Sequence, residues 1–275
     1  MVKVRKPIVS GIFYPDSEKV LKEELDRLRR EAPSPAAGRW KAVITPHGAY
    51  EYIGSVTTTA YLSISDSAAG EQPERVLLIG PVHREKENKL ILPESGVFRT
   101  PLGDAAVDLE SARRLAAACP CVVRDEIPHT EEHCLETQVP FIQHYFPGAA
   151  LLPVLAGDVT KRSARLFVDA LFAAIPRFLE TTLIVVTVNS AAAEEYGTAE
   201  KQAEECTKQL TPGNGDYFFT TEAAKDLSAC SLPCIGLLLH GRFGFSTVAR
   251  TGGLSSADIS KTPGKTVFYS AYSLA

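Results

Sequence analysis

Short apolar runs alternate with amphipathic stretches along most of the chain. Runs rich in Val, Ile and Leu are typical of buried strands, and apolar residues at three- and four-residue spacing are typical of helices that cover a sheet. Residues 182–188 form the most apolar short run, which predicts a central strand. Further strands are expected at residues 41–46, 76–80, 89–92, 149–155 and 266–272. Helices are expected at residues 17–30, 55–63, 108–119, 133–144, 160–174, 198–210, 221–229 and 235–240.

This order of elements predicts an α/β fold, a three-layer sandwich around one mixed β-sheet. Pro33 and Pro35 follow the first helical stretch and are expected to end it. No repeat of fixed period and no low-complexity tract interrupts the chain. We therefore expect residues 1–275 to form a single domain.

Composition narrows the possible partners and locations. The net charge is −4, and the short basic cluster at residues 27–30 is flanked by acidic residues, which disfavours nucleic acid as a partner. The longest apolar stretches are about ten residues, too short to span a membrane. The basic residues at the N-terminus precede a segment broken by Ser10, Gly11 and Pro15, so no signal peptide is indicated and a cytoplasmic location is expected. The six cysteines are then expected to be free thiols.

Two histidines each follow a strand-like run. His47 comes after residues 41–46, and His83 comes after residues 76–80. Ligands of open α/β sheets bind beyond the carboxyl ends of the strands, so two imidazoles there predict a metal or acid–base site. The alternative is that each histidine is a core or turn residue satisfied by the backbone. His133, preceded by two glutamates at the start of an amphipathic stretch, is a third candidate, with a helix-start role as its alternative.

Five short motifs in order along the chain resemble those of the Memo family, also called AmmeMemoRadiSam system protein B. Each motif alone is weak, but their order and spacing make the resemblance specific. The motifs are Ser10-Gly11-Ile12-Phe13-Tyr14-Pro15, Thr45-Pro46-His47-Gly48-Ala49-Tyr50, Gly80-Pro81-Val82-His83, Thr100-Pro101-Leu102-Gly103 and Glu132-His133-Cys134-Leu135-Glu136.

The resemblance implies a fold similar to that of class III extradiol dioxygenases, which hold non-haem Fe(II) with two histidines and a glutamate. In Memo proteins a cysteine takes the third position. Carried over by motif, the metal ligands here are His47, His83 and Cys230, with Cys234, four residues further on, as the alternative to Cys230. Two imidazoles and a thiolate suit iron or copper, with zinc as a further possibility.

The resemblance also implies roles for residues around the ligands. His133 is expected to act as acid–base, and Cys134 stands in the pocket where the family tends to have serine. Tyr50 lines the cleft or packs against its rim. The family's aspartate and histidine after the central strand are replaced by Ala192 and Glu195, so Glu195 is the remaining candidate there for a base or ligand.

Two classes of function follow from these expectations. The first is a metal-dependent oxidoreductase of the extradiol dioxygenase type acting on a small molecule. The second is a non-catalytic protein that uses a degenerate cleft to bind a metal ion, a peptide or protein partners. Zinc-dependent hydrolysis is a third, weaker alternative.

Overall fold

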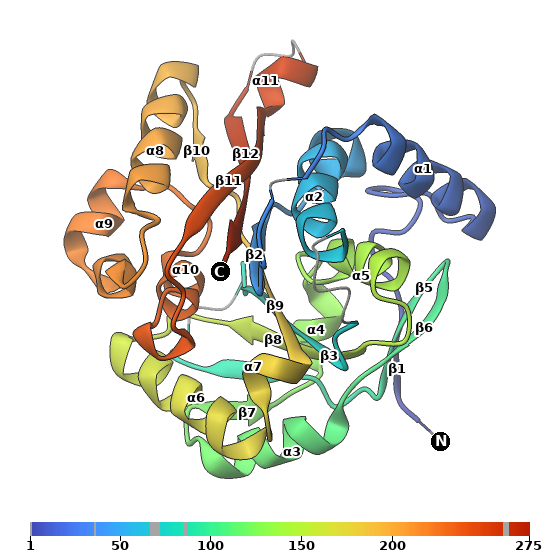
Figure 1. Cartoon of the computed structure of the whole chain (residues 1–275), viewed down its shortest axis with the longest axis vertical. Helices are drawn as coiled ribbons and strands as arrows, with labels where there is room; N and C mark the ends of the chain where they lie inside the picture. The colour runs from blue at the N-terminus through green and yellow to red at the C-terminus, as the bar shows by residue number, and fades with distance from the viewer. Residues whose placement is uncertain (1, 36, 67–71, 85–86, 261–263) are drawn as a thin grey trace.

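The computed structural model describes residues 2–35, 37–66, 72–84, 87–260 and 264–275, and these form a large mixed sheet with helices on both faces (Figure 1). Its centre is parallel, in the order β2, β9, β3, β8, and antiparallel strands complete it on both sides. Across the sheet the described strands are β10 (Ala191–Ala193), β12 (Thr266–Leu274), β2 (Ala42–Thr45), β9 (Thr182–Thr187), β3 (Arg75–Pro81), β8 (Ala150–Ala156), β4 (Leu90–Leu92) and β7 (Val122–Arg124), with β11 (Val248–Ser255) paired to β12.

Side-chain alternation along the central strands builds two separate cores. Ile44 and Ile79 belong to the apolar cluster on one face, whereas their neighbours Val43 and Leu78 belong to the cluster on the other. Because successive residues of a strand point to opposite faces, an all-apolar strand needs cover on both sides. The first face is covered by α3 (Leu109–Ala118), α6 (Lys161–Ala174), α8 (Tyr196–Gln209), η2 (Asn214–Phe219), α9 (Thr221–Asp226) and α10 (Leu232–Leu238). The second is covered by α1 (Glu18–Glu31), α2 (Tyr50–Ser65) and α5 (Val139–Tyr145).

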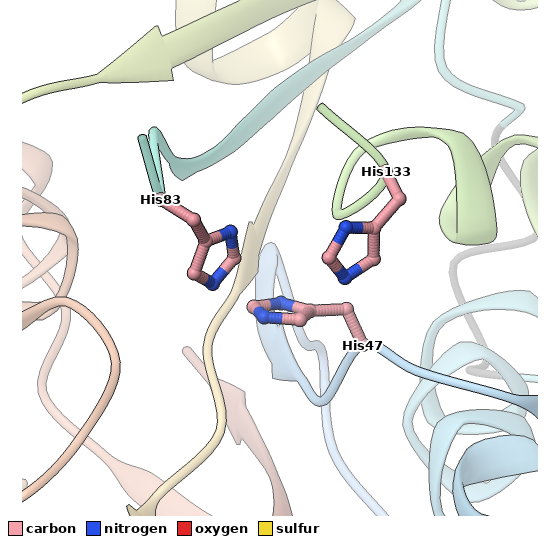
Figure 2. A group of neighbouring side chains, drawn as sticks. All are labelled: His47, His83 and His133. Atoms are coloured by element: carbon pink, nitrogen blue, oxygen red, sulfur yellow. The ribbon is translucent and has the colours of Figure 1, made fainter. Parts of the chain in front are cut away.

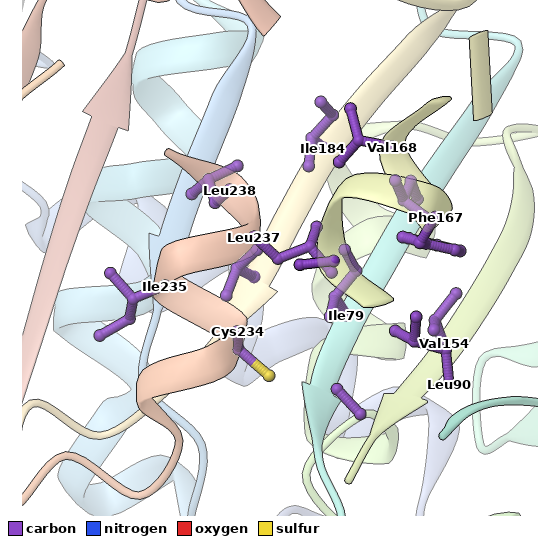
Figure 3. Close-up of a cluster of buried hydrophobic side chains, with 14 of the residues drawn as sticks. Ile79, Leu90, Val154, Phe167, Val168, Ile184, Cys234, Ile235, Leu237 and Leu238 are labelled. Atoms are coloured by element: carbon purple, nitrogen blue, oxygen red, sulfur yellow. The ribbon is translucent and has the colours of Figure 1, made fainter. Parts of the chain in front are cut away.

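The predicted α/β three-layer sandwich is therefore confirmed. Figure 3 shows the first core, where Leu237 of α10 and Phe167 of α6 pack over Ile79 and Val154 of the sheet. A separate three-stranded sheet, which the sequence analysis did not predict, lies beside the main one. Its strands are β1 (Val4–Arg5), β5 (Val97–Thr100) and β6 (Gly103–Ala106).

Two of the expected helices differ most from their predicted bounds. The helix expected at 55–63 is longer and begins at Tyr50, directly after the His47 turn. The helix expected at 133–144 is wrong in its first half, because the 3₁₀ turn η1 (Glu136–Gln138) comes first and α5 begins only at Val139. Pro140 lies in the first turn of α5, where a missing N–H costs nothing. His133 consequently lies on a loop.

The remaining helical segments are short, namely α4 (Ile127–Glu131), α7 (Phe178–Thr181), η3 (Gly241–Phe243) and α11 (Ser256–Ile259). Within the described part of the chain, no helix combines the length and apolar character needed to cross a membrane.

Candidate metal centre

Parallel neighbouring strands bring the two strand-end histidines together. β2 and β3 flank β9 with parallel pairing, so the carboxyl ends of all three strands meet at one edge of the sheet. His47 follows β2, and His83 follows β3. The predicted crevice beyond the strand ends is therefore where both imidazoles lie.

The three histidines form one cluster (Figure 2). Ring centroids are 5.2 Å apart for His47 and His83, 5.8 Å for His47 and His133, and 5.4 Å for His83 and His133. One nitrogen of each ring lies within 4.8 Å of the corresponding atoms of the other two. His47 is buried, His133 is half-buried and His83 is exposed, so the cluster is open on one side.

The residues after β9 hold His47. Its Nδ1 shares a hydrogen bond of 3.1 Å with Thr187 Oγ1, which leaves Nε2 as the nitrogen available to a ligand. The Asn189 side chain accepts from the backbone N–H of His47 at 3.0 Å and donates to its carbonyl at 3.1 Å. Burial, together with the neighbouring charges of His83 and His133, lowers the pKa of His47 to about 3, so its ring is neutral at physiological pH.

Glu132 joins the other two histidines. The Nδ1–H and the backbone N–H of His83 both donate to its Oε2 at 2.9 Å, and His133 Nδ1 lies 3.2 Å from its Oε1. Burial raises the pKa of Glu132, but the hydrogen bond and charge of His83 outweigh it and bring the pKa to about 2. A buried, ionised carboxylate thus fixes the tautomer of His83 and leaves Nε2 free to bind a ligand.

Cys230 completes the group of donor atoms. Its residue is exposed overall, but its Sγ lies 3.7 Å from His47 Nε2 and accepts from the Asn189 N–H at 3.2 Å. A hydrogen bond with Cys230, followed by that with Glu132, raises the pKa of His83 to about 10. Desolvation raises the pKa of the Cys230 thiol, and the hydrogen bond with His83 opposes this. The predicted ligand Cys230 and the predicted acid–base residue His133 therefore both lie beside His47 and His83.

A cavity of about 530 Å³ reaches the centre from the side of His83 and Cys230. Its walls are mostly apolar, and a few polar side chains stand at its margin, which is typical of small-molecule sites. The apolar lining includes Val82, Val159, Phe218, Phe219, Leu232 and Pro233, and the polar lining includes Asp158, Thr160 and Lys161.

Three other predicted site residues lie elsewhere. Tyr50 is buried, donates its hydroxyl to Thr137 O at 2.9 Å, and lines a different cavity, one that does not include the histidines. Cys134 lies beneath the site, where its buried thiol donates to Pro81 O at 3.2 Å. Glu195 is exposed at the N-cap of α8 and belongs neither to the histidine cluster nor to the cavity lining.

The residues that support the ligands were not predicted from the sequence. Glu132 was named as a motif residue and as a helix-start charge but was given no role at the site, although it contacts two histidines. Thr187 and Asn189 were not singled out at all, because small polar residues after an apolar strand are common. Their position at and directly after the most apolar run, which predicted the central strand, was the available signal.

The donor set fits a transition-metal ion. Imidazole suits zinc, copper and iron, and a thiolate adds preference for softer ions over magnesium or calcium. A metal-bound histidine usually has its second nitrogen engaged by a carboxylate, hydroxyl or carbonyl. Here Thr187 and Glu132 engage Nδ1 of all three rings, and Nε2 of each remains available.

Comparison with known proteins agrees with the motifs. A family model described as Memo-like protein matches residues 5–241. Similar proteins named MEMO1 family protein come from Pyrobaculum arsenaticum (26% identity, 98% of both chains), Thermotoga neapolitana (26%, 94% of both) and Nitrosopumilus maritimus (28%, 82% of both). The chain therefore belongs to the Memo-like family.

Proposed function

We propose that this protein binds one redox-capable transition-metal ion, iron or copper, and acts on a small molecule held in the adjoining cavity. The main support for this proposal is the cluster of three imidazoles, whose available nitrogens lie within 4.8 Å of one another. His47 and His83 supply two donors, and Cys230 is the third, with His133 as its alternative. Zinc fits the same donors and would give Lewis-acid chemistry in place of redox chemistry.

The residues around the proposed ion have different roles. A bound iron or copper ion would supply Lewis acidity and one-electron chemistry. Glu132 and Thr187 orient the imidazoles, and the apolar cavity walls exclude water from a bound ligand. If Cys230 is the third ligand, His133 remains free to move a proton, as an oxidoreductase of the extradiol type requires. Glu195 is exposed and takes no part in this proposal.

Metal content tests the centre directly. Elemental mass spectrometry on protein purified without chelators or a His-tag is expected to find iron or copper near one ion per chain. His47→Ala should abolish it. His144→Ala is the matched control, since His144 is half-buried beside Asp26 and lies outside the cluster. Equal metal content in wild type and His47→Ala would contradict the proposal.

Activity separates the classes of function. Oxygen-dependent turnover of a catechol by the iron-loaded protein, lost in His47→Ala, would support an oxidoreductase. Ester hydrolysis that persists without oxygen in the zinc-loaded protein would support the hydrolytic alternative instead. If the fully loaded protein shows neither of these activities, the catalytic part of the proposal is overturned.

A non-catalytic role is the second candidate. It is favoured by Ala192, whose side chain can act neither as acid nor as base, and by Glu195, which is exposed and lies outside the histidine cluster and the cavity lining. In that case the cavity would hold a peptide or a protein partner. Partner capture by the wild type, lost in Phe219→Arg with metal content unchanged, would support it.

The free cysteines fit a reducing compartment, and we propose a cytoplasmic location on that ground.

A further inference from the structure

A pair of thiols outside the metal centre lies at the end of α3. Cys119 follows the helix as its C-cap, and Cys121 precedes β7. Their Sγ atoms are 2.7 Å apart, and both cysteines are free thiols. Nonbonded carbon atoms, which are smaller than sulfur, rest at about 3.5–4.0 Å. The two sulfurs therefore lie well inside ordinary contact distance.

The local backbone creates this approach. The Val122 N–H donates to the Cys119 carbonyl at 3.0 Å, which closes a turn with Pro120 at its second position. Proline favours that position because its φ is already fixed near the required value. Both flanks are anchored, since the Cys119 N–H donates to Leu115 O and the Leu90 N–H donates to Cys121 O. The fold thus holds both thiols on the same side of a constrained turn.

The two thiols differ in accessibility. Cys119 is 1% exposed and belongs to the apolar core under α3 and α6. Cys121 is half-buried, and its thiol donates to Ser163 O in the first turn of α6 at 3.5 Å. An external reagent therefore reaches Cys121 first, and Cys119 is placed to react with the product.

We propose that Cys119 and Cys121 form a redox-active dithiol that a low-molecular-weight disulfide oxidises to an intrachain disulfide. The sulfurs need to approach by only about 0.7 Å to reach bonding distance. First, the Cys121 thiolate attacks one sulfur of the reagent, and the other sulfur leaves and takes up the proton lost by Cys121. Next, the Cys119 sulfur attacks Cys121 and releases the second thiol, which takes the Cys119 proton. Two protein thiols are oxidised, and one reagent disulfide is reduced to two thiols.

Burial and the neighbouring Cys119 raise the pKa of Cys121, so its thiolate is scarce at neutral pH. Exchange is consequently slow near neutrality and faster in mildly alkaline buffer. The two cysteines are therefore oxidised only when the ratio of disulfide to thiol in the surroundings stays high. A brief rise in this ratio leaves them reduced.

Peptide mass spectrometry tests the proposal on the full chain. Folded protein is equilibrated with reduced and oxidised glutathione, quenched with acid, denatured, alkylated and digested with trypsin. Cleavage after Arg114 and Arg124 releases residues 115–124, which contain only these two cysteines. In the oxidising mixture this peptide should lack alkyl groups and be lighter by two hydrogens. Return to reduced glutathione should restore two alkylation sites.

Three comparisons make the result decisive. In Cys121→Ser the peptide should no longer become lighter by two hydrogens in the oxidising mixture. In Cys206→Ser, which replaces a buried cysteine of α8, the peptide should still become lighter by two hydrogens. Cys119→Ala provides a second test if the serine variant does not fold. At one glutathione ratio, the oxidised-to-reduced ratio should be at least about tenfold higher in folded than in denatured chain, because the turn pre-orients the sulfurs. Two alkylated cysteines in every mixture, a lasting glutathione adduct on Cys121, or equal oxidation in folded and denatured chain would overturn the proposal.

Discussion

Glu132 supports the candidate metal centre through two histidines and three backbone N–H groups. The N–H groups of His83, His133 and Cys134 all donate to its carboxylate, in addition to the contacts with the two rings. It is buried, with 6% of its surface exposed. One carboxylate therefore determines the orientation of two imidazoles and the course of the loop between them.

Glu132→Gln is expected to weaken metal binding by about 10–100-fold, which is the usual effect of losing a group that orients a ligand. The amide of glutamine has only one oxygen that can accept, so at least one of the three backbone N–H groups loses its acceptor. Metal titration of the stripped protein measures the change. Glu131→Gln is the matched control, because Glu131 is exposed and pairs only loosely, at 3.6 Å, with Arg84. Similar affinities for the two variants would show that Glu132 does not support the ligands.

The proton on His83 gives a second expectation at this scale. In the metal-free protein the pKa of His83 is about 10, so the ring is protonated at pH 7 and must lose its proton to bind an ion. His47, with its pKa lowered to about 3, contributes no proton there. Metal affinity should therefore rise with pH, by up to about tenfold per unit below pH 10 from this group.

Calorimetry in buffers of different ionisation enthalpy checks this at pH 7. We expect at least about one proton released per ion bound. In Cys230→Ser the release should fall, because the thiol proton of Cys230 and the main cause of the raised His83 pKa are both gone. No proton release in the wild type would contradict the protonated state of His83.

At the scale of elements, a buried ion pair attaches the N-terminal segment to the loop that carries His133. Arg5 pairs with Glu136, and both side chains are almost completely buried. Arg5 also donates to the carbonyls of His129 at 2.9 Å and of Glu132 at 2.8 Å. Glu136 accepts from the N–H groups of Ile8 and Val9 and from the hydroxyl of Tyr14. The loop is therefore fixed from a distant part of the sequence.

Glu136→Gln is expected to lower the free energy of unfolding by about 3–5 kcal/mol, because it leaves Arg5 charged and buried without its partner. Urea denaturation measures the loss. Lys3→Met is the control, since it removes an exposed pair with Glu94 and should leave stability nearly unchanged. A small effect of Glu136→Gln would mean that water or another group solvates Arg5 in the variant.

The elements best predicted from sequence were strands that are buried on both faces of the sheet, because burial on both faces requires an unbroken apolar run. β3 and β9 are buried on both faces, so their unbroken apolar runs identified them and placed His83 at a strand end. β11 was missed because glycines and half-exposed residues interrupt its pattern. The helix expected at 133–144 was extended too far, because helical spacing of Leu135 and Val139 persists through a loop.

The site was predictable only in part, for a related reason. Strand-end histidines can be located from local pattern, and His133 was a further candidate from its place after two glutamates. The family motifs supplied Cys230 and the acid–base role of His133. The contacts of Glu132 and Thr187 depend on strand order and loop course, which no local pattern contains. Tyr50, which the resemblance placed in the cleft or against its rim, is buried at the start of α2 and lines a different cavity.

Over the whole molecule, two buried neutral histidines make the metal-free protein sensitive to acid. Burial lowers the pKa of His129 to about 4, and its Nε2–H donates to Ile91 O at 2.9 Å. His47 behaves similarly, with a pKa of about 3. In the unfolded chain both rings take up protons near pH 6.5, whereas in the folded protein they do not. Stability is therefore expected to fall as the pH drops from 6.5 towards 4.

His129→Gln should reduce this pH dependence, although it also lowers stability at neutral pH. From its pKa shift, His129 contributes roughly 3 kcal/mol to the difference in unfolding free energy between pH 7 and pH 4. Urea unfolding of the metal-free proteins across this range provides the measurement. A variant with the same slope as the wild type would show that other groups cause the acid sensitivity.

The wide separation of the donors along the chain has a consequence for when metal can be acquired. His47 and Cys230 contact each other across 183 residues, and Thr187, which orients His47, lies between them. A chain still emerging from the ribosome exposes its early histidines before β9 and Cys230 have been synthesised. It can offer single imidazoles to a passing ion, but not the assembled set of donors. Tight binding of the proposed metal ion would therefore require the fully synthesised and folded chain.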